Sequence, residues 1–177
     1  MKGYRLKIST PDGSIFDGEA VKLDVRGIEG ELAVMAGHVP FMTAVKPGTC
    51  RLLFDDGIMK VTAYHNHHLR KCEDDCWRSF TFRIECEGKT VVYSGDVASC
   101  DDLNGAIGDG CDALIMETGH HKIMDIHSYW QTKKIGTVYF NHCGREILND
   151  PEGAAVKLKN LFGCRAVLCE DAMTVEI

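Results

Sequence analysis

The first part of the chain alternates short apolar stretches with turn signals. The apolar stretches are Leu6 to Ile8, Ala20 to Val25, Leu32 to Met35 and Cys50 to Phe54. Groups such as PDG, GIEG, AGH, KPG and DDG separate them, roughly every eight to twelve residues. Turn signals at this interval favour an all-β sandwich or barrel.

The pattern changes between Gly57 and Lys60, after which strand-like and helix-like segments alternate. The predicted strands are Ser79 to Glu85, Thr90 to Tyr93, Ala113 to Glu117, Thr137 to Asn141, Arg165 to Cys169 and Met173 to Ile177. Predicted helices lie near Asp101 to Ile107, around Lys122 to Lys133, and after Pro151 with Gly163 as the stop. The alternation indicates a layered α/β half-domain with much of its sheet buried.

Two of the predicted helices have an apolar face. Ile123, Ile126 and Trp130 fall on one side of the first of these, and Ala154, Ala155, Leu158 and Leu161 are expected to point inward from the second. We therefore predict an α+β fold, with β-sandwich-like strands in residues 1–57 followed by half of a layered α/β sandwich in residues 58–177.

Composition excludes several classes of protein. A chain of 177 residues with 45% hydrophobic residues is expected to bury a core, and a net charge of −6 offers no basic surface for nucleic acid or an anionic membrane. No apolar run approaches the about 18 residues that membrane insertion requires. The nine cysteines are odd in number, and no charged-then-apolar leader is present, so we expect a reduced, cytoplasmic protein.

The pair Cys72 and Cys76 stands apart from the other cysteines because it lies in a charged segment, KCEDDCW. With His67 or His68 nearby, it could hold zinc, although structural zinc sites usually have four clear ligands. Burial as small apolar side chains is the expected role of cysteines such as Cys86 and Cys164.

Candidate chemistry gathers at the ends of two predicted strands. Asp96 closes the run that starts at Lys89, and His142 closes the run that starts at Ile135, while further histidines stand upstream at His65, His67 and His68. Carboxylate and imidazole groups delivered from separate strand ends are a common way to build a metal or catalytic site. The structural alternatives are a turn cap for Asp96 and a backbone-bonded histidine for His142.

The N-terminal run from Leu6 to Gly57 resembles the start of the epsilon subunit of a rotary ATP synthase. It carries the P-x-G-x-x-F-x-G-E opening, the EGELAVMAGHVP middle and the KPG turn in that order. The resemblance implies a β-sandwich that packs on the ATP synthase gamma subunit and the ring of c subunits.

From about Met59 to Ile177 the chain resembles the C-terminal half of a metallo-β-lactamase-fold hydrolase. The matching segments are NHHL, FRIECEGKTVVYSGD, DALIMETGHH, VYFNHCG and CEDAMTVEI. The resemblance implies a half of the αβ/βα sandwich and metal ligands at His68, Asp96 and His142, with His67 as the runner-up for the first. The ions would be zinc, iron or manganese.

The H-x-H-x-D-H cluster, which supplies four further ligands in that family, occurs nowhere in the sequence. By the family's arrangement each of two ions would keep about two of its four protein ligands, whereas a catalytic zinc normally has three plus water. A second chain would then complete the site, or activity would be largely lost. Homo-oligomerisation is expected also because half-sandwiches leave strand edges unpaired, and pairing of the two parts with each other is the alternative.

Four residues around the strand ends are candidates for supporting roles. The resemblance implies that His120 and His121 lie in a loop over the site, where they and the preceding Glu117 could be ligand supports or substrate contacts. Capping or solvation is the alternative for the two histidines. Asp125 could orient a neighbour, or it could simply suit the first turn of a helix.

Three hypotheses of function follow. The first is a metal-dependent hydrolase of the metallo-β-lactamase superfamily with impaired or partner-dependent activity. The second is a non-catalytic assembly protein that docks on an ATP synthase through the epsilon-like segment. The third is an accidental or engineered fusion of two truncated genes without a selected function.

Overall fold

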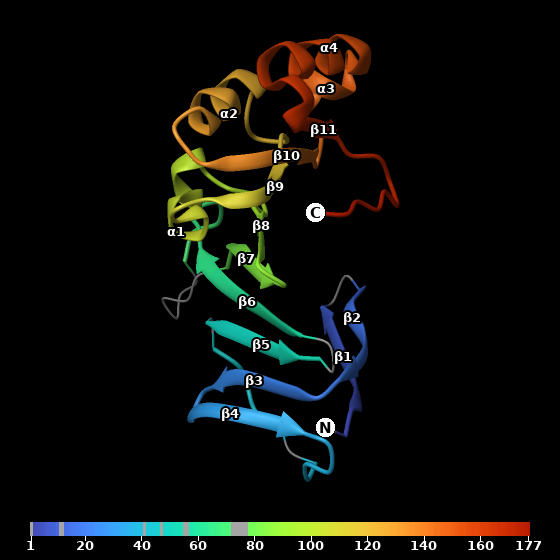
Figure 1. Cartoon of the computed structure of the whole chain (residues 1–177). Helices are drawn as coiled ribbons and strands as arrows, with labels where there is room; N and C mark the ends of the chain where they lie inside the picture. Colours follow the sequence, from blue (N-terminus) through green and yellow to red (C-terminus); the bar gives the residue numbers. More distant parts are fainter. Residues whose placement is uncertain (1, 11–12, 41, 47, 55–56, 72–77) are drawn as a thin grey trace. The chain divides into compact units, whose positions relative to one another are not determined.

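The computed structural model describes residues 2–10, 13–40, 42–46, 48–54, 57–71 and 78–177, without the side chains of 9, 10, 13–15 and 58. Cys72 and Cys76, the candidate zinc pair, lie outside the described residues. The chain forms two compact units (Figure 1). The first comprises Met1–Thr62 with Glu85–Gly88, and the second comprises Ala63–Ile84 with Lys89–Ile177.

The first unit is built of antiparallel strands. Its strands are β1 (Tyr4–Thr10), β2 (Gly13–Ala20), β3 (Lys22–Gly27), β4 (Gly30–Met35), β5 (Thr49–Leu53) and most of β6 (Ile58–His65). β1 and β2 form a hairpin, and the other strands form a sheet in the order β4-β3-β5-β6. The all-β character predicted for the N-terminal segment is confirmed.

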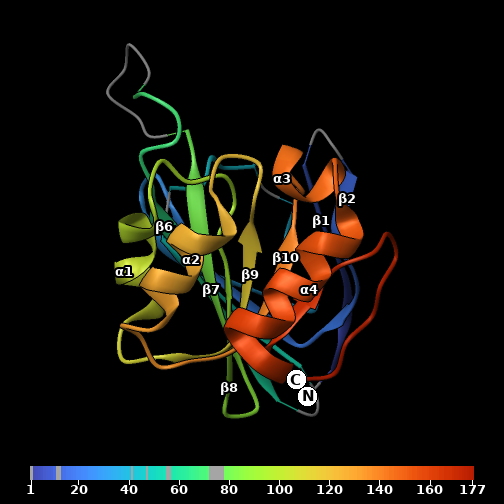
Figure 2. The same ribbon diagram turned by 90° about the horizontal axis from the view of Figure 1, so that it is seen from above.

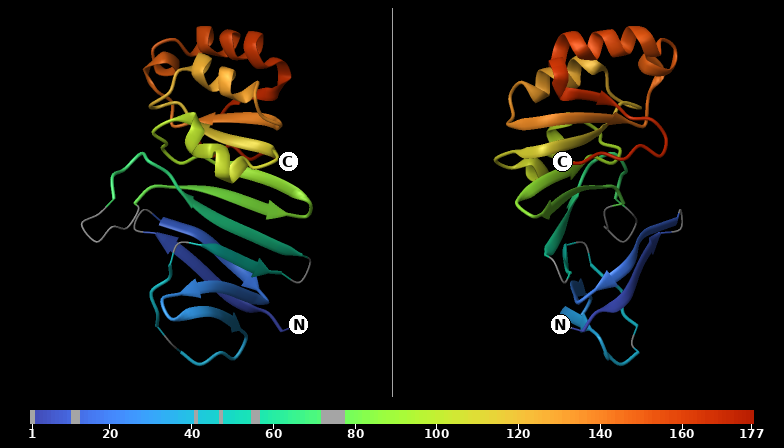
Figure 3. Two further views of the ribbon diagram at one scale, coloured as in Figure 1. Left: turned by 90° about the vertical axis from the view of Figure 1, so that its left-hand side faces the viewer. Right: turned by 45° about the vertical axis from the view of Figure 1, so that its right-hand side comes forward.

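The hairpin and the sheet of the first unit meet through few buried side chains. Figure 3 shows the hairpin in dark blue beside the lighter blue and teal strands, and the Tyr4 hydroxyl donates to Val34 O over 3.1 Å. Ala20, Val21 and Leu52 are the apolar residues buried among the described side chains of this unit. Its core is therefore small.

The second unit carries a sheet in the order β7-β8-β9-β10-β11 with helices on one face. The strands are β7 (Phe80–Cys86), β8 (Lys89–Tyr93), β9 (Cys111–Glu117), β10 (Ile135–Asn141) and β11 (Ala166–Leu168). The helices are η1 (Cys100–Leu103), α1 (Asn104–Ile107), α2 (Ile123–Trp130), α3 (Arg145–Leu148), α4 (Pro151–Phe162) and η2 (Gly163–Arg165). From β8 to β11 each strand is parallel to its neighbour. The α+β class is confirmed.

One hydrophobic core joins the helices to this sheet, and Figure 2 shows the helices lying over one face of it. Leu114 on β9 and Phe140 on β10 are fully buried, and Ile126 on α2 is 1% exposed. Ile123 and Trp130 are buried beside Ile126, so the apolar face predicted for α2 is confirmed. Parallel strands need cover on their faces, and on this face the helices supply it.

The structure differs from the sequence prediction in several details. Met173–Ile177 forms no strand, because its alternating Met, Val and Ile side chains find no partner strand and remain 39–46% exposed. Ala155 is exposed, since the buried stripe of α4 follows Ala154, Leu158 and Phe162 at a spacing of four. The short helix α3 was not predicted, because its four residues are too few to show a period.

The parallel strands bring three loops to one edge of the sheet. The loops that follow β8, β9 and β10 all start at carboxyl ends of neighbouring strands. Loops at this edge are the usual place for ligand sites in open α/β sheets. Among the described residues, no helix is both long and apolar enough to cross a membrane.

Candidate metal centre

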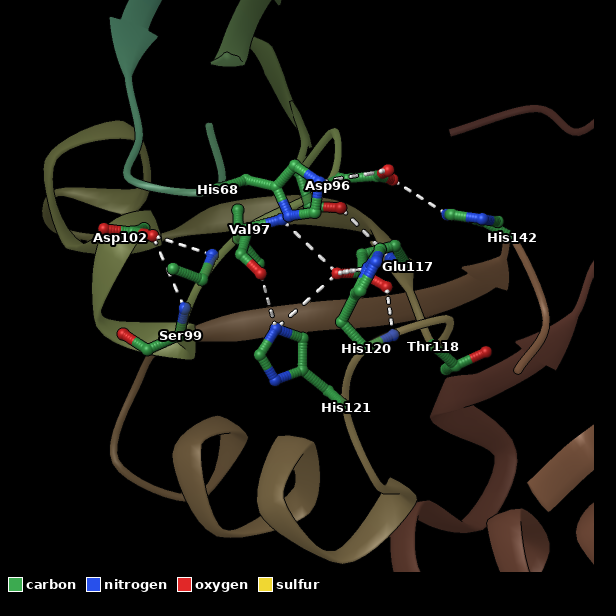
Figure 4. Close-up of polar contacts among 12 residues, drawn as sticks. His68, Asp96, Val97, Ser99, Asp102, Glu117, Thr118, His120, His121 and His142 are labelled. Atoms are coloured by element: carbon green, nitrogen blue, oxygen red, sulfur yellow. Dashed lines mark hydrogen bonds and ion pairs between the residues drawn. The ribbon is translucent and has the colours of Figure 1, made fainter. Parts of the chain in front are cut away.

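Acidic and histidine side chains meet at the carboxyl edge of the second unit's sheet. Asp96 lies in the loop after β8, Glu117 ends β9, and His142 directly follows β10. His120 comes from the loop after β9, and His68 from the segment after β6. Figure 4 shows how these side chains gather from separate elements.

A glycine turn places Asp96. Gly95 has φ of +57°, and a Cβ there would lie 2.6 Å from Phe80 O. Any other residue would be strained by this φ and would collide with the backbone of β7. The turn therefore needs glycine and directs the next residue, Asp96, away from the sheet.

A second unusual backbone conformation places His142. Its φ is +43°, in the left-handed region that histidine enters more readily than bulky apolar residues. A Cβ at Gly119 would lie only 3.0 Å from the His142 ring, so the neighbouring loop leaves room for the imidazole. The chain thus turns sharply after β10 and directs the ring toward Asp96.

Asp96 faces two imidazoles with its two oxygens. The His142 Nδ1–H donates to Asp96 Oδ1 over 2.8 Å. His68 Nε2 lies 3.8 Å from Asp96 Oδ2. The side chain of Asp96 is 39% exposed and that of His142 is 52% exposed, so both are open to an incoming ion. The three ligands implied by the sequence resemblance therefore lie together.

Glu117 is buried at the centre of the site. Its carboxylate accepts hydrogen bonds from Val97 N at 3.3 Å and His120 N at 2.9 Å. It also accepts from His120 Nδ1 at 3.0 Å, and its side chain is 2% exposed. A buried carboxylate is stable only when it is well hydrogen-bonded, and these contacts satisfy it. Glu117 consequently joins the loops that carry Asp96 and His120.

The His120 ring lies between the other two imidazoles. Its centroid is 4.6 Å from that of His68 and 5.6 Å from that of His142. Asp96, Glu117, His120 and His142 each offer a ligand atom, and all four atoms lie within 4.8 Å of one another. We call these four residues the carboxylate–histidine cluster.

His67 points elsewhere. Its ring Nδ1–H and its backbone N–H both donate to Asp102, whose side chain is 7% exposed. Burial by itself raises the pKa of Asp102, but hydrogen bonds from His67, Ala98 and Ser99 outweigh it and hold the pKa below its ordinary value. Of the two adjacent histidines, His68 is therefore the one that faces Asp96.

His121 and Asp125 stand outside the cluster. His121 Nε2–H donates to Val97 O over 2.9 Å and lies 3.5 Å from Glu117 Oε1. The hydrogen bond to Val97 supports the loop that carries Asp96, and His121 is not a member of the cluster. Asp125 is exposed in the first turn of α2. Burial raises the pKa of the Cys100 thiol to about 11, and the Asp125 carboxylate is one of the neighbours that add to this.

The donor atoms fit a divalent transition metal. Imidazole nitrogens with a carboxylate suit zinc, iron or manganese, and no thiolate belongs to the cluster. The sequence did not identify Asp102 as part of this region. Its only signal was a capping pattern, since Ser99 and Asp102 have the spacing of a reciprocal helix cap.

A family model and a known relative match the N-terminal part of the chain. Residues 3–67 match the family model described as ATP synthase, delta/epsilon chain, β-sandwich domain. The sodium ion specific ATP synthase epsilon chain of Acetobacterium woodii is 47% identical over 53 residues, which cover 30% of this chain and 40% of that relative. This chain thus spans less than half the length of that relative.

The solved structure of Zn²⁺-bound PqqB from Methylobacterium extorquens is similar to this chain with a TM-score of 0.44 and 16% sequence identity. The aligned region covers 75% of this chain and 52% of the PqqB chain. For the N-terminal part, the family model and the relative both confirm the resemblance seen in the sequence. That part of the chain is an epsilon-like β-sandwich segment.

Proposed function

We propose that the second unit binds a divalent zinc, iron or manganese ion and acts as a metal-dependent hydrolase. The observation that carries the proposal is the convergence of His68 and His142, from two separate segments, on the two oxygens of Asp96. The metallo-β-lactamase-like segments of the sequence support the same ligand set. Zinc, iron and manganese all accept this combination of donors.

A bound ion of this kind would lower the pKa of a coordinated water and polarise the bond to be hydrolysed. The residues themselves would have three tasks. Asp96 and His142 would hold the ion, and the 2.8 Å hydrogen bond between them, which the ion would replace, brings the two side chains together before it arrives. Glu117 would keep the loops of Val97 and His120 together. His68, whose Nε2 lies 3.8 Å from Asp96 Oδ2, would supply the remaining ligand of the set.

The absent H-x-H-x-D-H cluster bears on both the number of ions bound and the rate of hydrolysis. With fewer ligands than the family uses, the site would hold fewer ions, and hydrolysis would be slow or would depend on a partner chain. The substrate of such a hydrolase would be an ester, a phosphodiester or a thioester. The ester class is the simplest to test because aryl esters report hydrolysis by colour.

The test is metal content in the purified full chain by elemental analysis, with Asp96→Ala and His142→Ala as variants. We expect close to one equivalent of zinc, iron or manganese in the wild-type protein and its loss in both variants. His38→Ala is the control, because His38 is exposed in the first unit. Wild-type protein that binds no added zinc, iron or manganese would contradict the proposal.

A second function is favoured by the family match over residues 3–67. The epsilon-like segment would dock on an ATP synthase gamma subunit in the cytoplasm. Co-purification of the full chain with an isolated gamma subunit tests this role. Retention that survives Asp96→Ala supports docking without catalysis, and failure to retain the gamma subunit excludes it.

A further inference from the structure

The cluster contains a histidine, His120, that the family resemblance does not count as a ligand. We infer that His120 joins Asp96 and His142 as the third protein ligand of a single metal ion, and that Glu117 is the residue that positions it. This inference rests on the proposed metal binding. It replaces the expectation of two half-liganded ions with one site that a single chain completes.

The position of His120 is the first argument. Its ring lies against both other imidazoles, with centroid separations of 4.6 Å to His68 and 5.6 Å to His142. Its ligand atom lies within 4.8 Å of those of Asp96 and His142, whereas His68 is not a member of that cluster. Ligand atoms in a tetrahedral zinc shell lie roughly 3.4 Å apart for bonds of about 2.0–2.1 Å. Movement of the exposed Asp96 and His142 side chains would close this difference while His120 stays in place.

The hydrogen bond to Glu117 is the second argument. Because the His120 Nδ1–H donates to Glu117 Oε1 over 3.0 Å, the neutral ring carries its lone pair on Nε2. Metal-binding histidines commonly donate their other ring N–H to a carboxylate, which fixes both the tautomer and the ring orientation. Glu117 and His120 have this arrangement before any ion is bound.

Glu117 itself is a poor ligand despite its place in the cluster. To reach an ion, its carboxylate would release the amides of Val97 and His120, which it holds at 3.3 Å and 2.9 Å. An amide that loses its acceptor in this way is destabilising, so the carboxylate is held in its present place. Its role is therefore positioning, and the ligands are Asp96, His120 and His142.

Three protein ligands leave a fourth position open for water. This is the composition of a catalytic zinc site, whereas structural sites are closed by four protein ligands. His68 faces the opposite oxygen of Asp96 at 3.8 Å and is not needed to complete the set. The sequence resemblance implies the opposite roles, with His68 as a metal ligand and His120 as a ligand support or substrate contact.

The test compares His120→Ala with His68→Ala in the full chain. Protein stripped with a chelator is titrated with Zn²⁺ against a chromophoric competitor, and with Co²⁺ to record the visible bands of the bound ion. Loss of a residue that only hydrogen-bonds to a metal ligand lowers metal affinity by about 10–100-fold. We expect His120→Ala to lower the Zn²⁺ affinity by more than this. His68→Ala should lose less and keep the Co²⁺ bands. Circular dichroism of the metal-free variants shows whether each is folded.

Glu117→Gln provides the positioning test. The amide keeps an acceptor oxygen but cannot serve the same set of donors, so we expect an about 10–100-fold loss of affinity. Imidazole ¹⁵N NMR should show the Nδ1–H tautomer of His120 in metal-free wild-type protein and a mixture in this variant. A purely structural role for Glu117 would leave the tautomer unchanged.

The outcomes separate the two proposals. Full affinity in His120→Ala together with loss in His68→Ala would overturn this inference while the metal-dependent function stands. Wild-type protein that binds neither Zn²⁺ nor Co²⁺ would remove both. Loss in His120→Ala with near-normal binding in His68→Ala and in the His38→Ala control supports the inference.

Discussion

The Nδ1 atom of His142 lies 2.8 Å from Oδ1 of Asp96, although 46 residues separate them in the chain. The contact exists because β8, β9 and β10 are parallel neighbours whose carboxyl ends share one edge. Two features of the backbone complete it, the glycine turn at Gly95 and the left-handed conformation of His142. Changes to the backbone should therefore affect the site as strongly as changes to the ligands.

Gly95→Ala should weaken both stability and metal binding. The new Cβ would meet Phe80 O at 2.6 Å with φ at +57°, and strain of this kind costs about 1–3 kcal/mol. The turn can relax only by moving Asp96. Urea unfolding and Zn²⁺ titration measure the two effects. Gly108→Ala is a matched control, because its φ is +54° with nothing within 4 Å of the added Cβ. Equal loss of Zn²⁺ affinity in both variants would contradict this account.

Asp102 should contribute pH-dependent stability through its contact with His67. Its pKa in the folded protein lies below the ordinary value of 3.8, so the unfolded chain binds the proton more readily. The stabilisation is fully present above about pH 5 and fades as the pH falls through 3.8 and below. Asp102→Asn should lower the free energy of unfolding by about 1–3 kcal/mol at pH 7.

The difference between Asp102→Asn and wild type should shrink as the pH falls below 4, as followed by urea unfolding across a pH series. Glu146→Gln is a useful comparison, because Glu146 also has a lowered pKa but contacts Lys157 and Ile123 instead. A constant difference for Asp102→Asn from pH 7 to pH 3 would show that the charge of Asp102 has no part in its contribution.

Cysteine alkylation should follow burial. Burial raises the pKa of Cys100 to about 11 and that of Cys111 to about 11, so at pH 8 only roughly one part in a thousand of each is the reactive thiolate. Cys164 is exposed, so the burial expected for it from the sequence is wrong, and among the described cysteines it should react first with iodoacetamide. Peptide mass spectrometry over time measures the order. Early labelling of Cys111 in folded protein would contradict the core described here, and labelling in denaturant should reach all nine cysteines.

Metal ions should stabilise the second unit against heat. An ion at about 100 times its dissociation constant stabilises the folded state by about 2.7 kcal/mol, because it binds the folded form alone. The melting transition of the second unit should rise by several degrees on addition of Zn²⁺ and return after chelation. Phe140→Ala, which removes a fully buried ring and costs about 3–5 kcal/mol, identifies the transition that belongs to this unit. A Zn²⁺-induced shift that persists in Asp96→Ala would place binding elsewhere.

The sequence predicted the strands of the second unit well because their apolar runs are distinct and bounded by turns. It failed at Met173–Ile177, where the alternation is that of a strand but pairing depends on a neighbour that a local pattern cannot reveal. The same limit applies to α4. The sequence placed its start at Pro151 and its end at Gly163, yet assigned Ala155 to the buried face.

The site shows the same division between local and long-range information. Asp96 and His142 could be found because each ends a strand-like run. The choice between His67 and His68 could not be made from the residues themselves, since it depends on Asp102, 35 residues beyond His67. Glu117 and His120 are close in sequence, but their place in a candidate metal site follows only from the nearby ring of His142.

The parallel arrangement of β8, β9 and β10 has a consequence for how the protein folds. Each pair of parallel strands is joined by a crossover through a helix, so none of these pairings can form as a simple hairpin. Such long-range contacts are slow to form, because the chain between them must close before they contribute. Asp96, His120 and His142 therefore meet only when both crossovers have closed. An ion held by all three would bind only chains in which both crossovers have formed, and it would slow the unfolding of those chains.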